Sequence, residues 1–231
     1  MSGPQHIVSA FSDELDQLSA DLLRMGGLAE AMIRDASRAV VARDVALAET
    51  VIERDREMDR YQREVERNVV RMLALRQPMA SDLRNVIGAI KLAGGIERIG
   101  DLAKNIARRS IAVANENNRT TLRGIERMGQ AVSRMLQVAL DAYQRRDPVT
   151  ALAVLDQDDD IDSHYNSLLR SMLVFMAEEP DQLHTRSNFI FIVKNLERIG
   201  DHCTNIAKVV HFIATGQQVG EAETLIRPQP E

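Results

Sequence analysis

Proline interrupts this sequence at only three interior points, and that spacing limits what the chain can fold into. The 231-residue chain has six prolines, and away from its two ends they are Pro78, Pro148 and Pro180. Between these positions apolar residues recur at steps of three and four, which places them on one face of an α-helix. One such stripe consists of Leu15, Leu18, Leu22, Met25, Ala29, Met32 and Ala36. The spacing therefore predicts long helices, each of which buries one apolar stripe against its neighbours.

The pattern predicts six helices, over residues 5–42, 44–76, 79–115, 119–146, 148–178 and 181–215. Pro148 suits the first turn of the fifth helix. Candidate N-caps are Ser81 or Asp82 for the third helix and Asp181 for the sixth. Because the connections are short, successive helices are expected to be antiparallel.

The fold class is therefore all-α. The six long helices should form two tandem, related antiparallel three-helix bundles, or one elongated six-helix body. The first bundle would span residues 5–115 and the second residues 119–215. Residues 216–231 are expected to form a disordered tail.

Composition supports a helical protein and argues against several functions. Apolar residues make up 45% of the chain and aromatic residues only 3%, which suits packed helices better than a β-sandwich. The net charge of −5 makes nucleic acid a poor default partner. The single cysteine excludes an intramolecular disulfide framework. Neither a secretory signal nor a membrane-spanning segment is evident, so we expect a cytoplasmic protein without membrane insertion.

A short motif occurs twice, one hundred residues apart. The segment "GGIERIGDLAKNIARR" begins at Gly94, and "KNLERIGDHCTNIAKV" begins at Lys194. Each contains a Glu and an Asp four positions apart, which share one helix face. Acid pairs with the same spacing occur in the second and fifth predicted helices. The eight acids are Asp55, Asp59, Glu97, Asp101, Asp158, Asp162, Glu197 and Asp201.

The prolines bring these acid pairs level with one another. Asp59 and Glu97 are each 19 positions from Pro78, and the other two acids of that half are each 23 positions away. Residues equidistant from the turn of an antiparallel hairpin lie at the same height. In the second half the corresponding midpoint is 179.5, beside Pro180. Register does not constrain helix rotation, and competing registers are offered by Glu53, Glu57, Asp156 and Asp160.

Four carboxylates that face one another need a counter-charge, because like charges within about 4–6 Å raise one another's pKa. Arg98 and Arg198 adjoin the acids in sequence, but adjacent side chains point in different directions around a helix. A divalent metal ion would balance the charge. Carboxylate oxygens suit Mg²⁺, Mn²⁺, Ca²⁺ or iron rather than a thiolate-type zinc site. The sequence therefore predicts two metal sites, one in each half, and leaves the roles of His164, His202 and Cys203 open.

Enzyme motifs are largely missing from the sequence. A ferritin-type di-iron oxidase would need Glu-x-x-His on two helices, and this pattern does not occur. The phosphate-loop, nucleophile-elbow and dinucleotide-binding patterns are also absent. A hydrolase that uses two metal ions stays possible, although no general base is evident outside the acids.

The repeated segments "IERIGDLAKNIAR" and "LERIGDHCTNIAK" resemble the PhoU family of bacterial phosphate-transport and phosphate-signalling regulators. The resemblance covers about residues 10–215 as two tandem copies. It implies two related three-helix bundles whose acidic motifs bind metal ions, sometimes as multinuclear clusters. Carried over residue by residue, it assigns metal binding to the same eight acids. The candidate ions are then magnesium, manganese, iron or zinc.

The resemblance also implies a function that is not enzymatic. Such a protein would be a cytoplasmic negative regulator of the phosphate-starvation response and of phosphate uptake. It would be a metal-binding adaptor between the ATPase of a phosphate ABC transporter and a sensor histidine kinase, and it would form a homodimer. A metal-dependent hydrolase or oxidase that uses the carboxylate clusters is the alternative.

Overall fold

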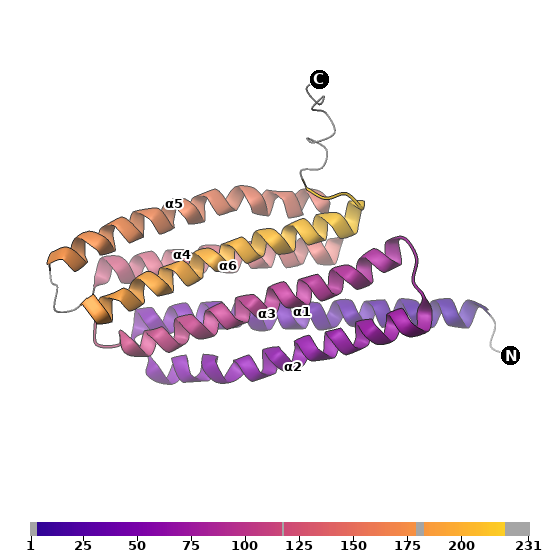
Figure 1. Ribbon diagram of the computed structural model, residues 1–231, viewed down its shortest axis with the longest axis horizontal. Coiled ribbons are helices and arrows are strands. Elements are labelled where there is room, and N and C mark those ends of the chain that lie inside the picture. The colour runs from indigo at the N-terminus through magenta and orange to yellow at the C-terminus, as the bar shows by residue number, and fades with distance from the viewer. Residues whose placement is uncertain (1–3, 117, 179–182, 220–231) are drawn as a thin grey trace, which may run out of the picture.

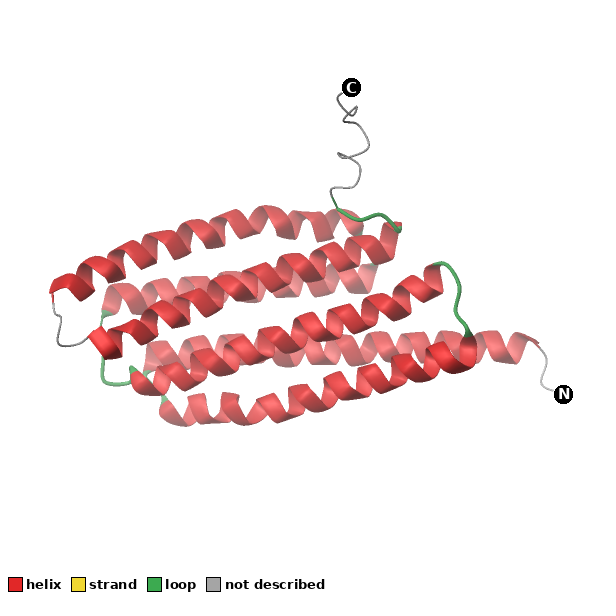
Figure 2. Cartoon of the chain, viewed as in Figure 1, coloured by secondary structure: helices red, strands yellow, loops and turns green. Residues whose placement is uncertain are grey.

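The computed structural model describes residues 4–116, 118–178 and 183–219, and these form six helices without a strand (Figure 2). The helices are α1 (Pro4–Ala42), α2 (Val45–Arg76), α3 (Ser81–Ala112), α4 (Arg119–Arg145), α5 (Pro148–Glu178) and α6 (Leu183–Thr215). The all-α prediction is confirmed. Among the helix bounds, prediction and structure differ most at the end of α3, which was predicted at residue 115 and is observed at Ala112.

The start of α3 differs from the prediction that Ser81 or Asp82 caps it. The helix begins at Ser81 itself, so both residues lie inside its first turn. The preceding residue, Ala80, has φ 49° and ψ −113° and a side chain that cannot accept a hydrogen bond. The proposed cap Asp181 lies outside the described residues. Three further residues, which were not predicted as caps, accept hydrogen bonds at helix N-termini: Asp44, Asn118 and Asp147.

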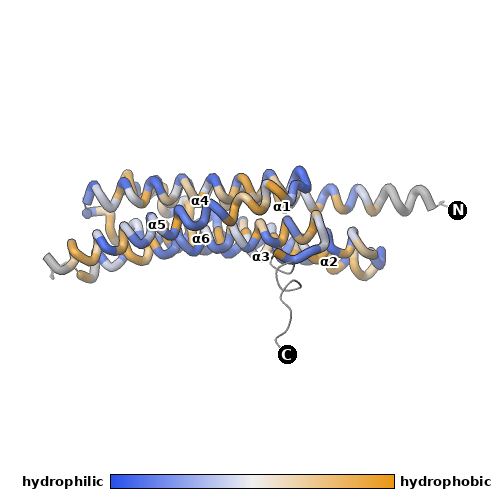
Figure 3. Tube along the Cα trace, turned by 90° about the horizontal axis from the view of Figure 1, so that it is seen from above, coloured by the Kyte–Doolittle hydropathy of each residue, from blue (hydrophilic) through white to orange (hydrophobic). Residues whose placement is uncertain are grey.

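The six helices form an elongated bundle of two layers (Figures 1 and 3). One layer contains α2, α3, α6 and α5 side by side in that order. The other contains α1, which packs on α2 and α3, and α4, which packs on α5 and α6. Each half is thus a three-helix unit, and the two units meet through α1 with α4 and α3 with α6. The α2–α3 connection lies at one end of the molecule (Figure 1). The C-terminal end of α5 and the N-terminal end of α6 lie at the opposite end.

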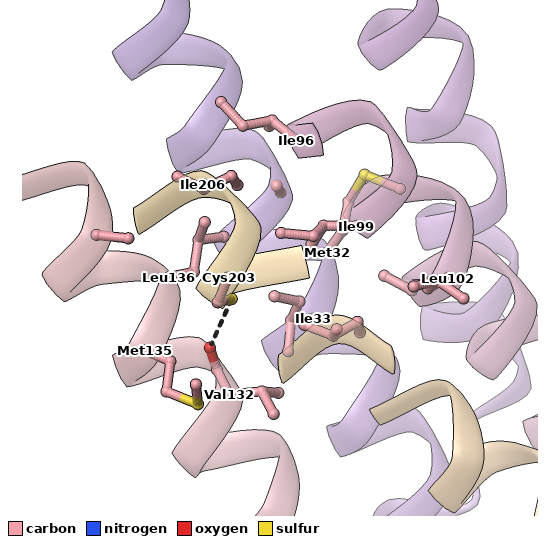
Figure 4. Packing of buried hydrophobic residues seen from close by; sticks show 14 of the residues in the cluster. Met32, Ile33, Ile96, Ile99, Leu102, Val132, Met135, Leu136, Cys203 and Ile206 are labelled. Carbon is pink, nitrogen blue, oxygen red and sulfur yellow. Dashed lines mark hydrogen bonds between the residues drawn. The ribbon is translucent and has the colours of Figure 1, made fainter. Parts of the chain in front are cut away.

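A continuous apolar core joins the two units (Figure 4). Four helices contribute to its centre, with Met32 and Ile33 from α1, Ile96 and Ile99 from α3, Val132 and Leu136 from α4, and Cys203 and Ile206 from α6. Methionine and aliphatic side chains fill this interior, as the scarcity of aromatic residues predicted. The two repeats therefore fold against each other as one body.

The far end of α6 leads into the segment predicted as a disordered tail. The helix ends before Gly216, whose φ of 77° lies in the left-handed region that glycine adopts readily after a helix. Of residues 216–231, the structure describes only those up to 219. Among the described helices, none combines the length and the apolar composition that crossing a membrane requires.

Candidate metal centres

The first group of carboxylates lies where α2 packs against α3. On α2, Val51 and Met58 are buried, and Asp55 lies at the half-buried border of that face. On α3, Ile96 is buried and its neighbour Glu97 is half-buried. Burial of the apolar stripes therefore turns the acidic borders of the two helices toward the same groove.

All four predicted acids of the first half interact there. The pKa of Glu97 is raised, mainly by burial. The negative charges of Asp101, Asp59 and Asp55 add to this rise, whereas Arg98 opposes it. We call these four acids the first cluster.

A lysine, Lys104, lies within the first cluster and was not predicted as part of it. The Nζ of Lys104 donates hydrogen bonds to Asp55 Oδ2 at 2.7 Å and to Asp101 Oδ1 at 2.5 Å. It thereby joins α2 to α3, and its side chain is only 14% exposed. Burial lowers the pKa of Lys104, but the hydrogen bonds to the two carboxylates outweigh it and raise the pKa above its ordinary value. Lys104 follows Asp101 by three positions, and this spacing could have indicated a shared helix face.

Arginines contribute only at the exposed rim of the first cluster. Arg98 lies 3.8 Å from Glu97 and 3.6 Å from Asp101, with a side chain that is 65% exposed. Asp59 lies 3.9 Å from Arg63 on its own helix. These longer, solvated ion pairs contribute little to stability compared with a short buried one.

The second group of carboxylates lies between α5 and α6. Burial raises the pKa of Asp158 to about 6, together with the negative charges of Asp201, Asp162 and Glu197. All four predicted acids of the second half therefore interact, and we call them the second cluster. Asp162 and Asp201 are exposed to solvent, whereas Asp158 and Glu197 are half-buried.

The charges of the second cluster are poorly compensated. Lys194 Nζ donates to Glu197 Oε1 at 2.5 Å, but it comes from the same helix and its side chain is 44% exposed. Glu197 Oε2 is buried, and no residue that the structure describes donates a hydrogen bond to it. Among the described residues, the carboxylates of Asp158, Asp162 and Asp201 accept no side-chain hydrogen bond and form no ion pair. A buried oxygen without a partner is costly, so this site favours a cation.

The mid-helix glycines of the two motifs allow close approach of the neighbouring helix. A Cβ at Gly200 would lie 2.9 Å from Asp158 Oδ1, so glycine leaves room for that carboxylate. A Cβ at Gly100 would instead meet the side chain of Met58, at 3.1 Å from its Cγ. The same motif position therefore accommodates a carboxylate in one half and an apolar side chain in the other.

The remaining candidate residues lie apart from these contacts or have other partners. Glu57 lies 3.7 Å from Arg60 on its own helix. His164 Nδ1 lies 2.7 Å from the backbone carbonyl oxygen of Asp160. The competing acids Glu53, Asp156 and Asp160 are exposed.

Two motif residues that follow Asp201 are partly or fully buried. Burial lowers the pKa of His202, as do Arg198 and Arg98, whereas Asp201 opposes the shift. Burial raises the pKa of the Cys203 thiol, and its Sγ lies 3.9 Å from the carbonyl oxygen of Val132 (Figure 4). Cys203 is therefore a packed, protonated core residue.

The two clusters differ in how well they fit a metal ion. As they stand, no three His, Cys, Asp or Glu side chains of the described residues are gathered closely enough to hold one ion. Carboxylate oxygens are nevertheless the ligands that hard cations prefer. Among the described residues of the second cluster, only Glu197 has an ion pair, with Lys194, and its Oε2 accepts no hydrogen bond. The second cluster therefore fits a cation by its chemistry, and the first fits one only when Lys104 is displaced.

Six helices in two repeats, each repeat with an acidic cluster between its last two helices, define a class of all-helical tandem-repeat proteins. The family model described as the PhoU domain matches this chain twice, over residues 22–110 and 125–210. The chain belongs to the PhoU family.

Relatives match over nearly the whole chain. A protein of Caulobacter vibrioides is 42% identical over 216 residues, which cover 93% of this chain and 94% of the relative. A protein of Rhizobium meliloti is 44% identical over 214 residues, which cover 92% and 90%. Both are named phosphate-specific transport system accessory protein PhoU homolog.

Solved structures share the fold. The crystal structure of PhoU from Pseudomonas aeruginosa matches with a TM-score of 0.86 and 38% identity, over 90% of this chain and 100% of that one. The phosphate transport system regulatory protein PhoU from Streptococcus pneumoniae matches with a TM-score of 0.83 and 28% identity, over 90% and 99%. The prediction of two related three-helix units is thus confirmed by both the domain matches and the fold.

Proposed function

We propose that this protein is a non-enzymatic accessory regulator of phosphate transport. In this proposal it works in the cytoplasm, limits phosphate uptake and holds the phosphate-starvation response off when phosphate is plentiful. Support comes from relatives at 42–44% identity over most of the chain, which are named as accessory proteins of a phosphate-specific transport system. The related Streptococcus pneumoniae structure is described as a regulatory protein of such a system.

The observation that carries the metal-binding part of the proposal is the poor charge compensation of the second cluster. Glu197 Oε2 is buried and accepts no hydrogen bond from the described part of the chain, and the pKa of Asp158 is raised to about 6 by burial and by the acids around it. Asp158, Asp162, Glu197 and Asp201 would hold a magnesium, manganese, iron or zinc ion. Such an ion would neutralise the carboxylates and hold α5 and α6 together.

The proposal assigns the partners to exposed helix surfaces. We expect a dimer of this chain that binds the ATPase of a phosphate ABC transporter and a sensor histidine kinase. Exposed apolar side chains at the hairpin ends support a protein partner, since such groups mark interaction sites. At the α2–α3 end, Leu75 is 70% and Met79 is 80% exposed, and on α5 Val174 is 63% exposed.

Deletion of the gene in the source bacterium tests the regulatory role. A reporter driven by a phosphate-starvation promoter should become active in phosphate-rich medium, and a plasmid copy of the wild type should silence it again. A triple variant, Asp158→Asn with Glu197→Gln and Asp201→Asn, should fail to silence it. Asp156→Asn, an exposed acid on the same helix, is the matched control and should act like the wild type. Unchanged reporter output after deletion would contradict the proposal.

A phosphatase assay separates this proposal from the hydrolase alternative. The purified protein should show no turnover above background with magnesium, manganese or ferrous ions. Turnover that Asp201→Asn abolishes would favour a metal-dependent hydrolase. Elemental analysis of protein purified without chelator, compared with the triple variant, tests metal binding independently of either activity.

A further inference from the structure

The two clusters have corresponding acids but different residues three positions beyond the last acid. In the first motif this residue is Lys104, and one hundred positions later the second motif has Thr204. The Lys104 ammonium donates to acids on both helices, at 2.7 Å to Asp55 on α2 and at 2.5 Å to Asp101 on α3. It therefore occupies the space between the helices in which a bound cation would neutralise these acids.

The second cluster has no equivalent of this ammonium among the described residues. Thr204 Oγ1 donates to the backbone carbonyl oxygen of Asp201 at 2.8 Å, within its own helix. Lys194 lies over the Tyr165 ring of α5, but among the four acids of the second cluster its only ion pair is with Glu197 of its own helix. Its side chain is 44% exposed, against 14% for Lys104. The carboxylate of Asp158 on α5 is left without a cation from α6.

We infer that Lys104 is a built-in cation that closes the first cluster to metal ions, so that each chain binds metal tightly at the second cluster alone. A metal ion could enter the first cluster only by expelling a largely buried ammonium and breaking its two charge-assisted hydrogen bonds. At the second cluster it would meet acids that lack such a partner. This inference rests on the proposed metal binding. It adds that Lys104 determines which of the two clusters binds the metal ion.

Metal titration of reciprocal variants tests the inference. The full-length protein is stripped with chelator and titrated with Mn²⁺, with binding followed by calorimetry and by elemental analysis after gel filtration. The wild type should bind at one class of tight site. Asp158→Asn should abolish that binding, whereas Asp55→Asn should leave it unchanged. Lys104→Thr, which copies the second motif, should add a second class of site of comparable affinity.

Further variants separate charge from packing. Lys104→Met keeps an unbranched apolar stem and removes the ammonium, so it should also open the first cluster to Mn²⁺. Lys104→Arg keeps a cation and should leave it closed. Circular dichroism and thermal melting in chelator verify that each variant folds, and Mn²⁺ should raise the melting temperature of Lys104→Met more than that of the wild type. The reciprocal change Thr204→Lys should weaken Mn²⁺ binding at the second cluster at least tenfold.

The outcomes distinguish failure of the inference from failure of the metal-binding proposal. Wild-type protein that binds Mn²⁺ at both clusters, with separate losses in Asp55→Asn and Asp158→Asn, would overturn the inference and keep metal binding. Folded Lys104→Met and Lys104→Thr proteins that gain no site would also overturn it. Absence of Mn²⁺ binding in the wild type and in all the variants would overturn both.

Discussion

The two halves of the bundle place corresponding acids between corresponding helices and yet neutralise them differently. In the first cluster, a lysine ammonium bridges Asp55 and Asp101. In the second, Asp158 lies against Gly200, forms no ion pair with any described residue and has a pKa of about 6. The internal repeat therefore predicts where the acids gather but not which cation neutralises them. A single difference within the repeat, Lys104 against Thr204, decides the balance.

The largest expected effect is that Asp-to-Asn substitutions in the two clusters change stability in opposite directions when metal is absent. Asp55→Asn takes one acceptor from the largely buried Lys104 ammonium and should lower the free energy of unfolding by about 2 kcal/mol. Asp158→Asn removes a carboxylate that has no cationic partner and should raise it by about 1 kcal/mol. Urea unfolding in chelator at neutral pH measures both. Changes of the same sign would contradict the difference between the clusters.

A methyl group at the two motif glycines should also distinguish the clusters. Gly200→Ala places a Cβ where the Asp158 carboxylate lies, so Mn²⁺ affinity should fall about tenfold through displacement of a ligand. Gly100→Ala meets the flexible Met58 side chain and should leave Mn²⁺ affinity within a factor of about two. Calorimetry on the two purified variants provides the comparison. Equal loss in both would show that the alanines act through the helices rather than through Asp158.

Titration of Asp158 should contribute to the pH dependence of the free energy of unfolding. Because the folded state binds this proton more tightly than the unfolded chain, its stabilising contribution is complete below the ordinary pKa of 3.8 and is lost as the pH rises to about 6. Asp158 is only half-buried, and screening by solvent limits the loss to about 1 kcal/mol. Unfolding measured in chelator across this range should show the loss in the wild type but not in Asp158→Asn. Glu97 shifts in the same direction in both proteins, so it cancels in their difference.

The smallest effect is expected at the rim of the first cluster. Arg98→Ala removes only solvated ion pairs of 3.6 and 3.8 Å and should change the free energy of unfolding by less than about 0.5 kcal/mol. Lys104→Met removes the buried ammonium and should cost about 2 kcal/mol in the same assay. Equal costs would mean that the exposed arginine compensates the cluster as well as the lysine does.

Much of this fold could be predicted from the sequence, and the exceptions have identifiable causes. The ends of α2 and α5 were predicted correctly, at Arg76 and Glu178, because the apolar period and the following proline are local signals. The start of α3 was not, because Ala80 adopts a positive φ that no residue type at that position signals. At the first cluster the four acids were identified, but their lysine was not. The spacing of three positions indicates that Lys104 and Asp101 share a helix face. The contact of Lys104 with Asp55 depends on how α2 is rotated about its axis, which the spacing does not indicate.

The six helices, their antiparallel order and the level at which each set of acids meets could be read from the sequence alone. These follow from a periodicity of 3.6 residues and from counting along each hairpin, which need no knowledge of distant contacts. The folded structure was needed to show that Lys104, rather than Arg98, lies between the acids of the first cluster. The physical reason is that burial of the shared apolar core by all six helices sets the rotation of α2 and α3, and that rotation turns one side chain into the groove and leaves the other in solvent.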